Sequence, residues 1–301
     1  MIEIRQILCP IDFSEPSRRA LDYAVALAGR FGSTITAFHV CPLAPATAYA
    51  PGPLLPVTVP TPDELQALLT SMQRFVGEDT GARASIRYEI GEGGAATEIL
   101  ERAQAIPSDL IVMGTHGRSG VDRLLLGSVT ERVVRKAKCP VLTVAPPVGE
   151  VTPVPDRLFS RILCGIDFSR ESLRALEYAL LLAADANARV KLAHVVEVTP
   201  APESDAGEVE TRTLGAYVAA AAEARAEQLQ SLVPKNIEKG LSVDTIVAIG
   251  KSHREILRIA AEDDSDLIVL GAHGLGIPQL LFGSTAQQVV RQARCPVLTT
   301  R

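Results

Sequence analysis

A long internal repeat constrains the fold of this 301-residue chain more than any other feature. Residues 7–28 match residues 162–183 at 15 of 22 positions with an offset of 155, and residues 108–117 match residues 265–274 at 8 of 10 positions. A period this long excludes a solenoid and indicates a duplicated domain. We therefore expect one domain at 1–146 and a second at 157–301, with the Pro-rich segment 146–156 as a stiff linker between them.

Each half alternates short apolar runs with helical patterns. In the first half, Ser14 suits a helix cap, with Pro16 in the first turn and Gly32 at the end. Strands are expected at 6–11, 34–40, 85–90, 110–113 and 141–144, and in the second half at 162–166, 190–196, 242–249, 267–270 and 297–300. Further helices are expected at 63–76, at 97–104 and within 121–137. This alternation predicts an α/β fold of two tandem, doubly wound, Rossmann-like domains, each with a five-stranded parallel sheet flanked by helices.

Composition excludes several classes of protein. The chain is 47% hydrophobic and 22% charged, which argues against disorder. It has no apolar run of transmembrane length and begins without a signal-peptide pattern. The net charge of −5 is spread without a basic region, so we expect no binding to nucleic acid or membrane. Five cysteines without a CxxC pair fit reduced thiols, and a cytoplasmic protein is expected.

The loop after the fourth strand carries the strongest chemical signal. It reads GTHGRSGVDRLLLGS and leads from a strand into a helix. Glycines allow close approach of the backbone to a ligand, and free N–H groups at a helix N-terminus bind anions. The segment lacks the Gly-Lys-Ser/Thr of a P-loop, and a flexible strand-to-helix connection is the alternative interpretation.

This loop resembles the nucleotide-binding motif of the universal stress protein family, G-2x-G-9x-G-S/T. Gly114, Gly117, Gly127 and Ser128 fit the full pattern. The segments IDFSEPS and KCPVLTV of the first half also resemble this family, and the resemblance covers both halves. It implies ATP as the ligand, with magnesium accompanying the triphosphate, and it implies that the last strands of the two halves pair, so that the halves pack as a pseudo-dimer. The residues implied to contact the nucleotide in the first half are Asp12, Val40, Met113, Gly114, Gly117, Arg118, Gly127, Ser128 and Val129.

The second half departs from the motif by one residue. Only eight residues separate Gly274 from Gly283, and Pro278 lies among them. The corresponding candidate residues are Asp167, Val195, Gly271, Gly274, Gly283 and Ser284. Whether this second site binds nucleotide is left open by the sequence.

Structural roles compete with several of these assignments. Asp12 could form a hydrogen bond at the entry to the first helix, Val40 could belong to the core, and Ser128 could cap the following helix. His116 and His273 lie inside the glycine loop, where a structural role is favoured over phosphate or metal contact.

The resemblance favours an ATP-binding regulator of the stress response that signals to a protein partner. A slow ATPase or phosphotransferase is the first alternative, although no P-loop lysine is present. A scaffold without nucleotide is the second. We predict no catalytic residues and no resident metal site, and the sequence leaves open whether two tandem chains form a homodimer.

Overall fold

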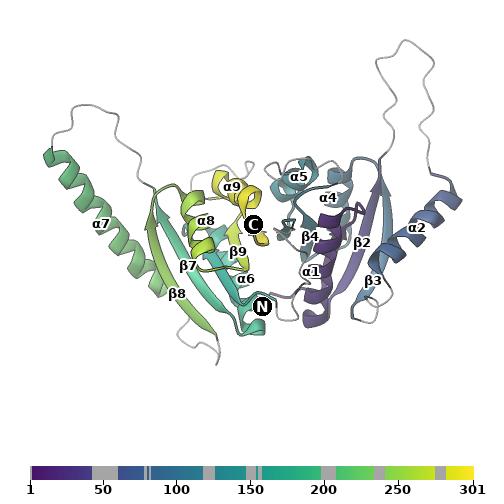
Figure 1. Cartoon of the computed structure of the whole chain (residues 1–301), viewed down its shortest axis with the longest axis horizontal. Helices are drawn as coiled ribbons and strands as arrows, with labels where there is room; N and C mark the ends of the chain where they lie inside the picture. Colours follow the sequence, from purple (N-terminus) through teal and green to yellow (C-terminus); the bar gives the residue numbers. More distant parts are fainter. Residues whose placement is uncertain are drawn as a thin grey trace, which may run out of the picture. The chain divides into compact units, whose positions relative to one another are not determined.

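The computed structural model describes residues 2–42, 60–77, 80, 83–117, 126–146, 154, 158–197, 208–233, 241–274 and 283–301. The chain divides into two compact units, Glu3–Asp156 and Arg157–Arg301. Each unit is a sheet covered by helices (Figure 1).

The first unit contains a parallel sheet of five strands. They are β1 (Gln6–Pro10), β2 (Thr34–Cys41), β3 (Ser85–Glu92), β4 (Leu110–Gly114) and β5 (Val141–Val144). Their order is β3-β2-β1-β4-β5, and all four pairings are parallel. The chain thus winds outward from β1 in one direction and then returns to β4 on the other side of β1. The switch point of the sheet lies between β1 and β4, and ligands of open α/β sheets bind at such a point.

The described helices of the first unit lie on both faces of its sheet. They are α1 (Glu15–Phe31), α2 (Pro62–Val76), α4 (Ala95–Ala105) and α5 (Ser128–Lys136). Helix α1 contacts α2, and α4 contacts α5. Right-handed crossover connections place helices on both faces of the sheet, because the direction in which the chain adds strands reverses at the switch point.

The second unit repeats this architecture. Its strands are β6 (Arg161–Gly165), β7 (Arg189–Val196), β8 (Ser242–Ile249), β9 (Leu267–Gly271) and β10 (Val297–Thr300). They are all parallel, in the order β8-β7-β6-β9-β10. The described helices are α6 (Arg170–Ala186), α7 (Glu208–Ser231), α8 (Ser252–Glu262) and α9 (Ser284–Gln292).

The predicted fold class of two Rossmann-like domains with five-stranded parallel sheets is confirmed. The central strands are buried on both faces, with Ile7, Leu8 and Cys9 of β1 fully inaccessible, as a parallel sheet between helix layers requires. The pairing of the last strands of the two halves stays a prediction. Within the described residues, no helix combines the length and the apolar character that crossing a bilayer requires.

The ends of α1 follow the sequence signals. The Ser14 side chain accepts a hydrogen bond from the Ser17 N–H, Pro16 occupies the first turn, and Gly32 ends the helix in the left-handed region at φ 66°. These caps determine where the chain leaves β1 and enters α1, so they also position the residues between the two elements.

Candidate functional site

A cavity of about 290 Å³ opens at the carboxyl ends of β1, β2 and β4 in the first unit. It lies at the switch point, where the strand order predicts a ligand site. Most of the predicted residues of the first half contribute to its wall: Asp12, Val40, Met113, Gly114, Gly117, Gly127, Ser128 and Val129. Arg118 lies outside the described residues.

The two carboxylate oxygens of Asp12 have different neighbours: Oδ1 faces Ser14 at the entry to α1, and Oδ2 faces Gly117 of the glycine loop. Its Oδ1 accepts hydrogen bonds from the backbone N–H of Ser14, at 3.0 Å, and from the Ser14 hydroxyl. Its Oδ2 is the atom that a side chain on Gly117 would meet, at 2.6 Å. Phe13, between Asp12 and Ser14 in the chain, adopts a left-handed φ of 63°. This conformation is energetically costly for a bulky residue, and it turns the chain toward α1. The helix-entry role and a role in the cavity therefore coexist at Asp12.

Gly114 serves the packing of the domain. A Cβ at this position would lie 2.8 Å from Pro16 Cβ and 2.9 Å from the Pro16 carbonyl carbon. The end of β4 therefore approaches the first turn of α1 more closely than any side chain allows. Gly271 has the same role in the second unit, because a Cβ there would lie 2.9 Å from the Ser172 nitrogen.

Helix α5 directs its N-terminus at the cavity without a side-chain cap. Gly127 is the N-cap residue, and its N–H donates to the Thr115 carbonyl oxygen at 2.9 Å. The Gly127 N–H, which we expected to serve a ligand, is thus already bonded. Ser128 is the first helical residue, so the alternative that it caps the helix is wrong. The N–H groups of Ser128, Val129 and Thr130 have no acceptor within an α-helix, and all three residues line the cavity.

Thr130 has a second function in this turn. Its hydroxyl is buried and donates to the Gly114 carbonyl oxygen at 2.8 Å. This bond ties the first turn of α5 to the end of β4 and holds the helix N-terminus at the cavity. Thr130 is not part of the glycine motif, although its place two residues after Ser128 on the same helical turn is a usable signal.

The other end of the cavity is apolar. Pro10, Phe38 and Met113 come from the sheet, and Ala95 and Ile99 come from α4. The contribution of α4 was missed, because no motif marks the helix that follows β3. This helix also begins without a side-chain cap, at Gly94. Two uncapped helix N-termini therefore meet at the first cavity.

His39 has a structural role beside the cavity. Its Nδ1 lies 2.7 Å from the Ile11 carbonyl oxygen, so Nδ1 is the protonated nitrogen that donates this bond. Its ring packs against Phe13 at 4.8 Å between centroids. The histidine thus ties the end of β2 to the turn that carries Asp12.

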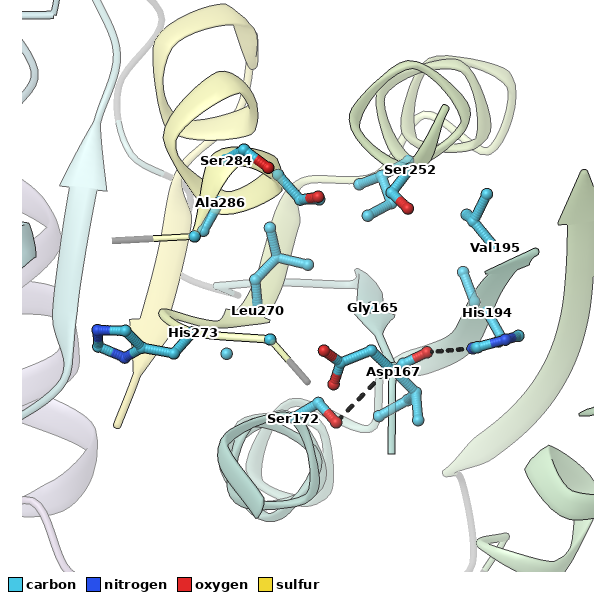
Figure 2. A pocket seen from close by; sticks show the side chains of 17 residues that line it. Gly165, Asp167, Ser172, His194, Val195, Ser252, Leu270, His273, Ser284 and Ala286 are labelled. Atoms are coloured by element: carbon cyan, nitrogen blue, oxygen red, sulfur yellow. Dashed lines mark hydrogen bonds between the residues drawn. The ribbon is translucent and has the colours of Figure 1, made fainter. Parts of the chain in front are cut away.

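The second unit has a cavity at the corresponding place, with about half the volume. It measures about 140 Å³, and Figure 2 shows the side chains that line it. All six predicted residues of the second half take part: Asp167, Val195, Gly271, Gly274, Gly283 and Ser284. Asp167 repeats the arrangement of Asp12, since its Oδ1 accepts hydrogen bonds from the Ser169 N–H and hydroxyl and its Oδ2 faces Gly274. The one-residue deletion between Gly274 and Gly283 falls outside the described residues.

Two histidines make the second unit sensitive to acid. Burial lowers the pKa of His194, and Arg225 lowers it further; burial and Arg301 lower the pKa of His273. A histidine with a depressed pKa stays neutral in the folded state while the unfolded chain takes up a proton. Stability is therefore complete above the unfolded value of about 6.5 and is lost as the pH falls through it.

We expect the urea midpoint of the second unit to fall between pH 7 and pH 5. Each histidine contributes at most about 1.4 kcal/mol per pH unit. Peptide-resolved hydrogen exchange in urea distinguishes the two units. His194→Asn keeps a donor for the Ile166 carbonyl but cannot titrate in this range, so it should flatten the pH dependence. A midpoint of the second unit that does not change over this range contradicts the prediction.

Comparison with known proteins agrees with the fold and the repeat. The model of the universal stress protein family matches residues 3–145 and again residues 158–301. A universal stress protein of Methanocaldococcus jannaschii is 37% identical over 147 residues, which cover 48% of this chain and 85% of that protein. The crystal structure of a universal stress protein from Archaeoglobus fulgidus covers 100% of this chain and 97% of its own at 22% identity, with a TM-score of 0.65.

Two doubly wound domains in one chain, each with a cavity at its switch point, define a tandem α/β protein. The double match to the family model makes the assignment specific: the chain belongs to the universal stress protein family, with one family domain in each half. One solved member, aligned with 47% of this chain at 24% identity and a TM-score of 0.34, is a complex with cAMP.

Proposed function

We propose that the first cavity binds ATP and that the protein acts as a nucleotide-responsive regulator in the stress response. The observation that carries the proposal is the uncapped N-terminus of α5 at this cavity. Three N–H groups without intrahelical acceptors and the positive end of the helix dipole favour phosphate there. Gly117 and Asp12 both line this cavity, and the absence of a side chain on Gly117 lets the Asp12 carboxylate lie close to the glycine loop.

The apolar end of the cavity suits a purine base. Met113 and Ile99 offer apolar surface, and the backbone of Val40 offers polar groups at the end of β2. A ligand that combines a flat apolar base with an anionic chain matches both ends of the cavity. Magnesium bound with the triphosphate would be held mainly by phosphate oxygens and water. Asp12 supplies the carboxylate among the described lining residues, so the site is compatible with the ion.

Binding without rapid hydrolysis fits the described residues better than phosphoryl transfer does. Efficient transfer requires cationic side chains around the phosphates and a positioned base. The described residues that line the first cavity include no lysine or arginine. The backbone N–H groups of α5 stabilise bound phosphate, but they supply no general base. We therefore propose that the nucleotide acts as a signal to a protein partner.

Calorimetric titration of the purified full chain with Mg-ATP tests this function. We expect saturable binding with a stoichiometry of one per chain, and mass spectrometry of the released ligand should detect adenine nucleotide. The absence of both heat and retained nucleotide would establish the alternative of a nucleotide-free scaffold. Single-turnover hydrolysis well above the uncatalysed rate, lost in Asp12→Ala, would establish the ATPase instead.

A further inference from the structure

The two cavities share the main features of the phosphate end, although Ala286 replaces Thr130 there, and they also differ at the base end. Each has an aspartate that faces a glycine and a helix N-terminus capped only by glycine. Their volumes nevertheless differ twofold, about 290 against 140 Å³. Among the described lining residues, the first cavity has Pro10 and Met113 at the base end where the second has Gly165 and Leu270.

Leu270 is one of the residues that line the second cavity. In Figure 2 it lies between Ser284 of α9 and the end of β6 at Gly165. Its Cδ2 occupies the space above Gly165 so closely that a Cβ there would lie 2.4 Å away. In the first unit the corresponding residues are Met113 and Pro10, which form the floor of the larger cavity.

A carboxylate occupies the second helix N-terminus at this cavity. Glu197 Oε1 accepts a hydrogen bond from the Ser252 N–H at 2.8 Å, at the first residue of α8. Hydrogen bonds from Ser252 hold the pKa of Glu197 below its usual range, so the carboxylate is ionised at neutral pH. In the first unit Pro42 and Ala95 take these positions, and no side chain caps α4 there. Glu197 lies beside the residues that line the second cavity, and its carboxylate bonds the N–H of one of them, Ser252. The N-terminus of α8 is therefore satisfied by a carboxylate, whereas no side chain caps that of α4.

We propose that the second cavity excludes the nucleotide, with Leu270 and Glu197 as the residues that determine this specificity. This inference rests on the proposed function of the first cavity. Leu270 removes the space for the base, and Glu197 repels an anionic ligand and satisfies the helix N-terminus. Each chain then binds one nucleotide, in the first cavity. The similar cavity of the second domain does not bind it.

Titration of four versions of the full chain with Mg-ATP tests the inference. We expect one site per chain in the unaltered protein and none in Gly117→Val, which destroys the first site. The double variant Leu270→Ala/Glu197→Gln should bind two ATP molecules per chain. The same two substitutions combined with Gly117→Val should leave one ATP molecule per chain. A second site in the unaltered protein overturns the inference while the proposed function survives. One site remaining in Gly117→Val overturns both, because the nucleotide then binds outside the first cavity. No binding in the unaltered protein overturns the proposed function itself.

The reciprocal exchange provides a test that does not depend on opening a cavity. Pro10→Gly/Met113→Leu places the residues of the second unit into the first cavity, and we expect the affinity for ATP to fall at least about tenfold. Hydrogen-exchange protection of β1 and β6 should match the unaltered protein in every variant that is compared. An unchanged affinity in the reciprocal variant, or a stoichiometry of one in a folded Leu270→Ala/Glu197→Gln variant, overturns the role of Leu270.

Discussion

Replacing Gly117 by valine is expected to abolish ATP binding at the first cavity. A Cβ at this position would lie 2.6 Å from Asp12 Oδ2. The carboxylate cannot swing away freely, because its other oxygen holds the Ser14 N–H at 3.0 Å and the Ser14 hydroxyl. The valine methyl groups also block the approach of phosphate to the loop backbone. We expect at least about a 100-fold loss of affinity, or about 2.7 kcal/mol, in calorimetric titration.

Gly274→Val is the matched control for this substitution. Its Cβ would meet Asp167 Oδ2 at 2.8 Å, so it introduces the same steric conflict into the second unit. We expect the stoichiometry and the affinity for ATP to stay unchanged, because the second cavity excludes the nucleotide. Retention of full affinity in Gly117→Val would show that the nucleotide binds elsewhere.

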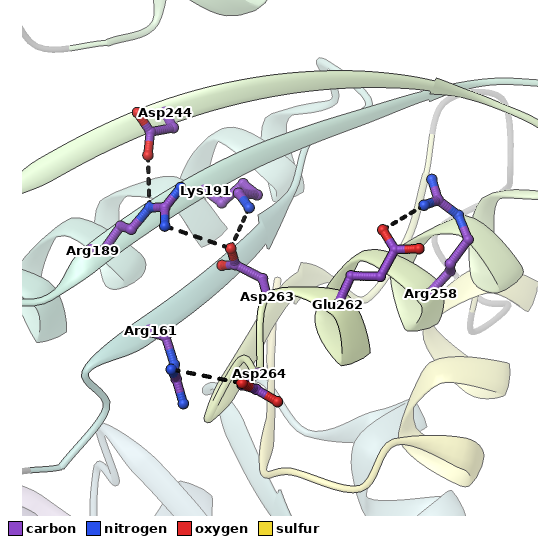
Figure 3. Close-up of polar contacts among 8 residues, drawn as sticks. All are labelled: Arg161, Arg189, Lys191, Asp244, Arg258, Glu262, Asp263 and Asp264. Atoms are coloured by element: carbon purple, nitrogen blue, oxygen red, sulfur yellow. Dashed lines mark hydrogen bonds and ion pairs between the residues drawn. The ribbon is translucent and has the colours of Figure 1, made fainter.

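Replacing Asp263 by alanine is expected to destabilise the second unit by about 1.5–3 kcal/mol, the usual contribution of a hydrogen bond between charged groups. Asp263 forms an ion pair with Lys191 of β7, and the two side chains are 9% and 16% exposed (Figure 3). Arg189 lies 3.7 Å from the same carboxylate and pairs with Asp244 on its other side. Removal of Asp263 leaves the part-buried Lys191 ammonium without this counterion, and the uncompensated charge is the main cost.

Hydrogen exchange resolved by peptide measures the loss in the unit where it arises. We expect faster exchange in β6, β7 and β9, with β1, β2 and β4 unaffected. Glu262→Ala is the control, since its pair with Arg258 is an exposed i,i+4 contact that contributes about 0.3–0.5 kcal/mol. Lys191→Met/Asp263→Ala should cost less than Asp263→Ala alone, because no part-buried cation then stays unpaired. If Asp263→Ala and Glu262→Ala lower the free energy of unfolding by the same amount, the lower exposure of the Asp263–Lys191 pair does not strengthen it, and the prediction is wrong.

The Lys191 pair also shows how the two copies diverged under one fold. The first unit has Thr36 and Ile106 at the corresponding positions, and Thr36 is buried without an ion pair. Both arrangements complete the same sheet. The ion pairs in Figure 3 therefore are not a requirement of the fold but a local property of the second copy.

Local signals were enough to predict the elements and the edge of the sheet that carries the site. The cap at Ser14, the left-handed Gly32 and the buried apolar runs act within a few residues of chain, so they are readable from the sequence. The repeat supplied the domain count, and the strand–helix alternation placed Asp12 and Gly117 at one edge. Both residues do line one cavity.

The tertiary structure decided what each of these residues contributes. Gly114 proved to be a packing glycine against α1, and the Gly127 N–H proved to be bonded to Thr115, because both depend on contacts between elements that no spacing reveals. The apolar end of the cavity depends on Ile99 of α4, which carries no motif.

The sequence by itself thus determined that the chain contains two copies of one α/β domain and where their candidate loops begin. Only the tertiary structure decided that the copies are unequal at the base end. Leu270 and Met113 look interchangeable as apolar residues before a glycine, and their effect on cavity volume appears only when β9 and β6 bring Leu270 over Gly165. A difference in side-chain shape becomes a difference in binding only through neighbours that are distant along the chain.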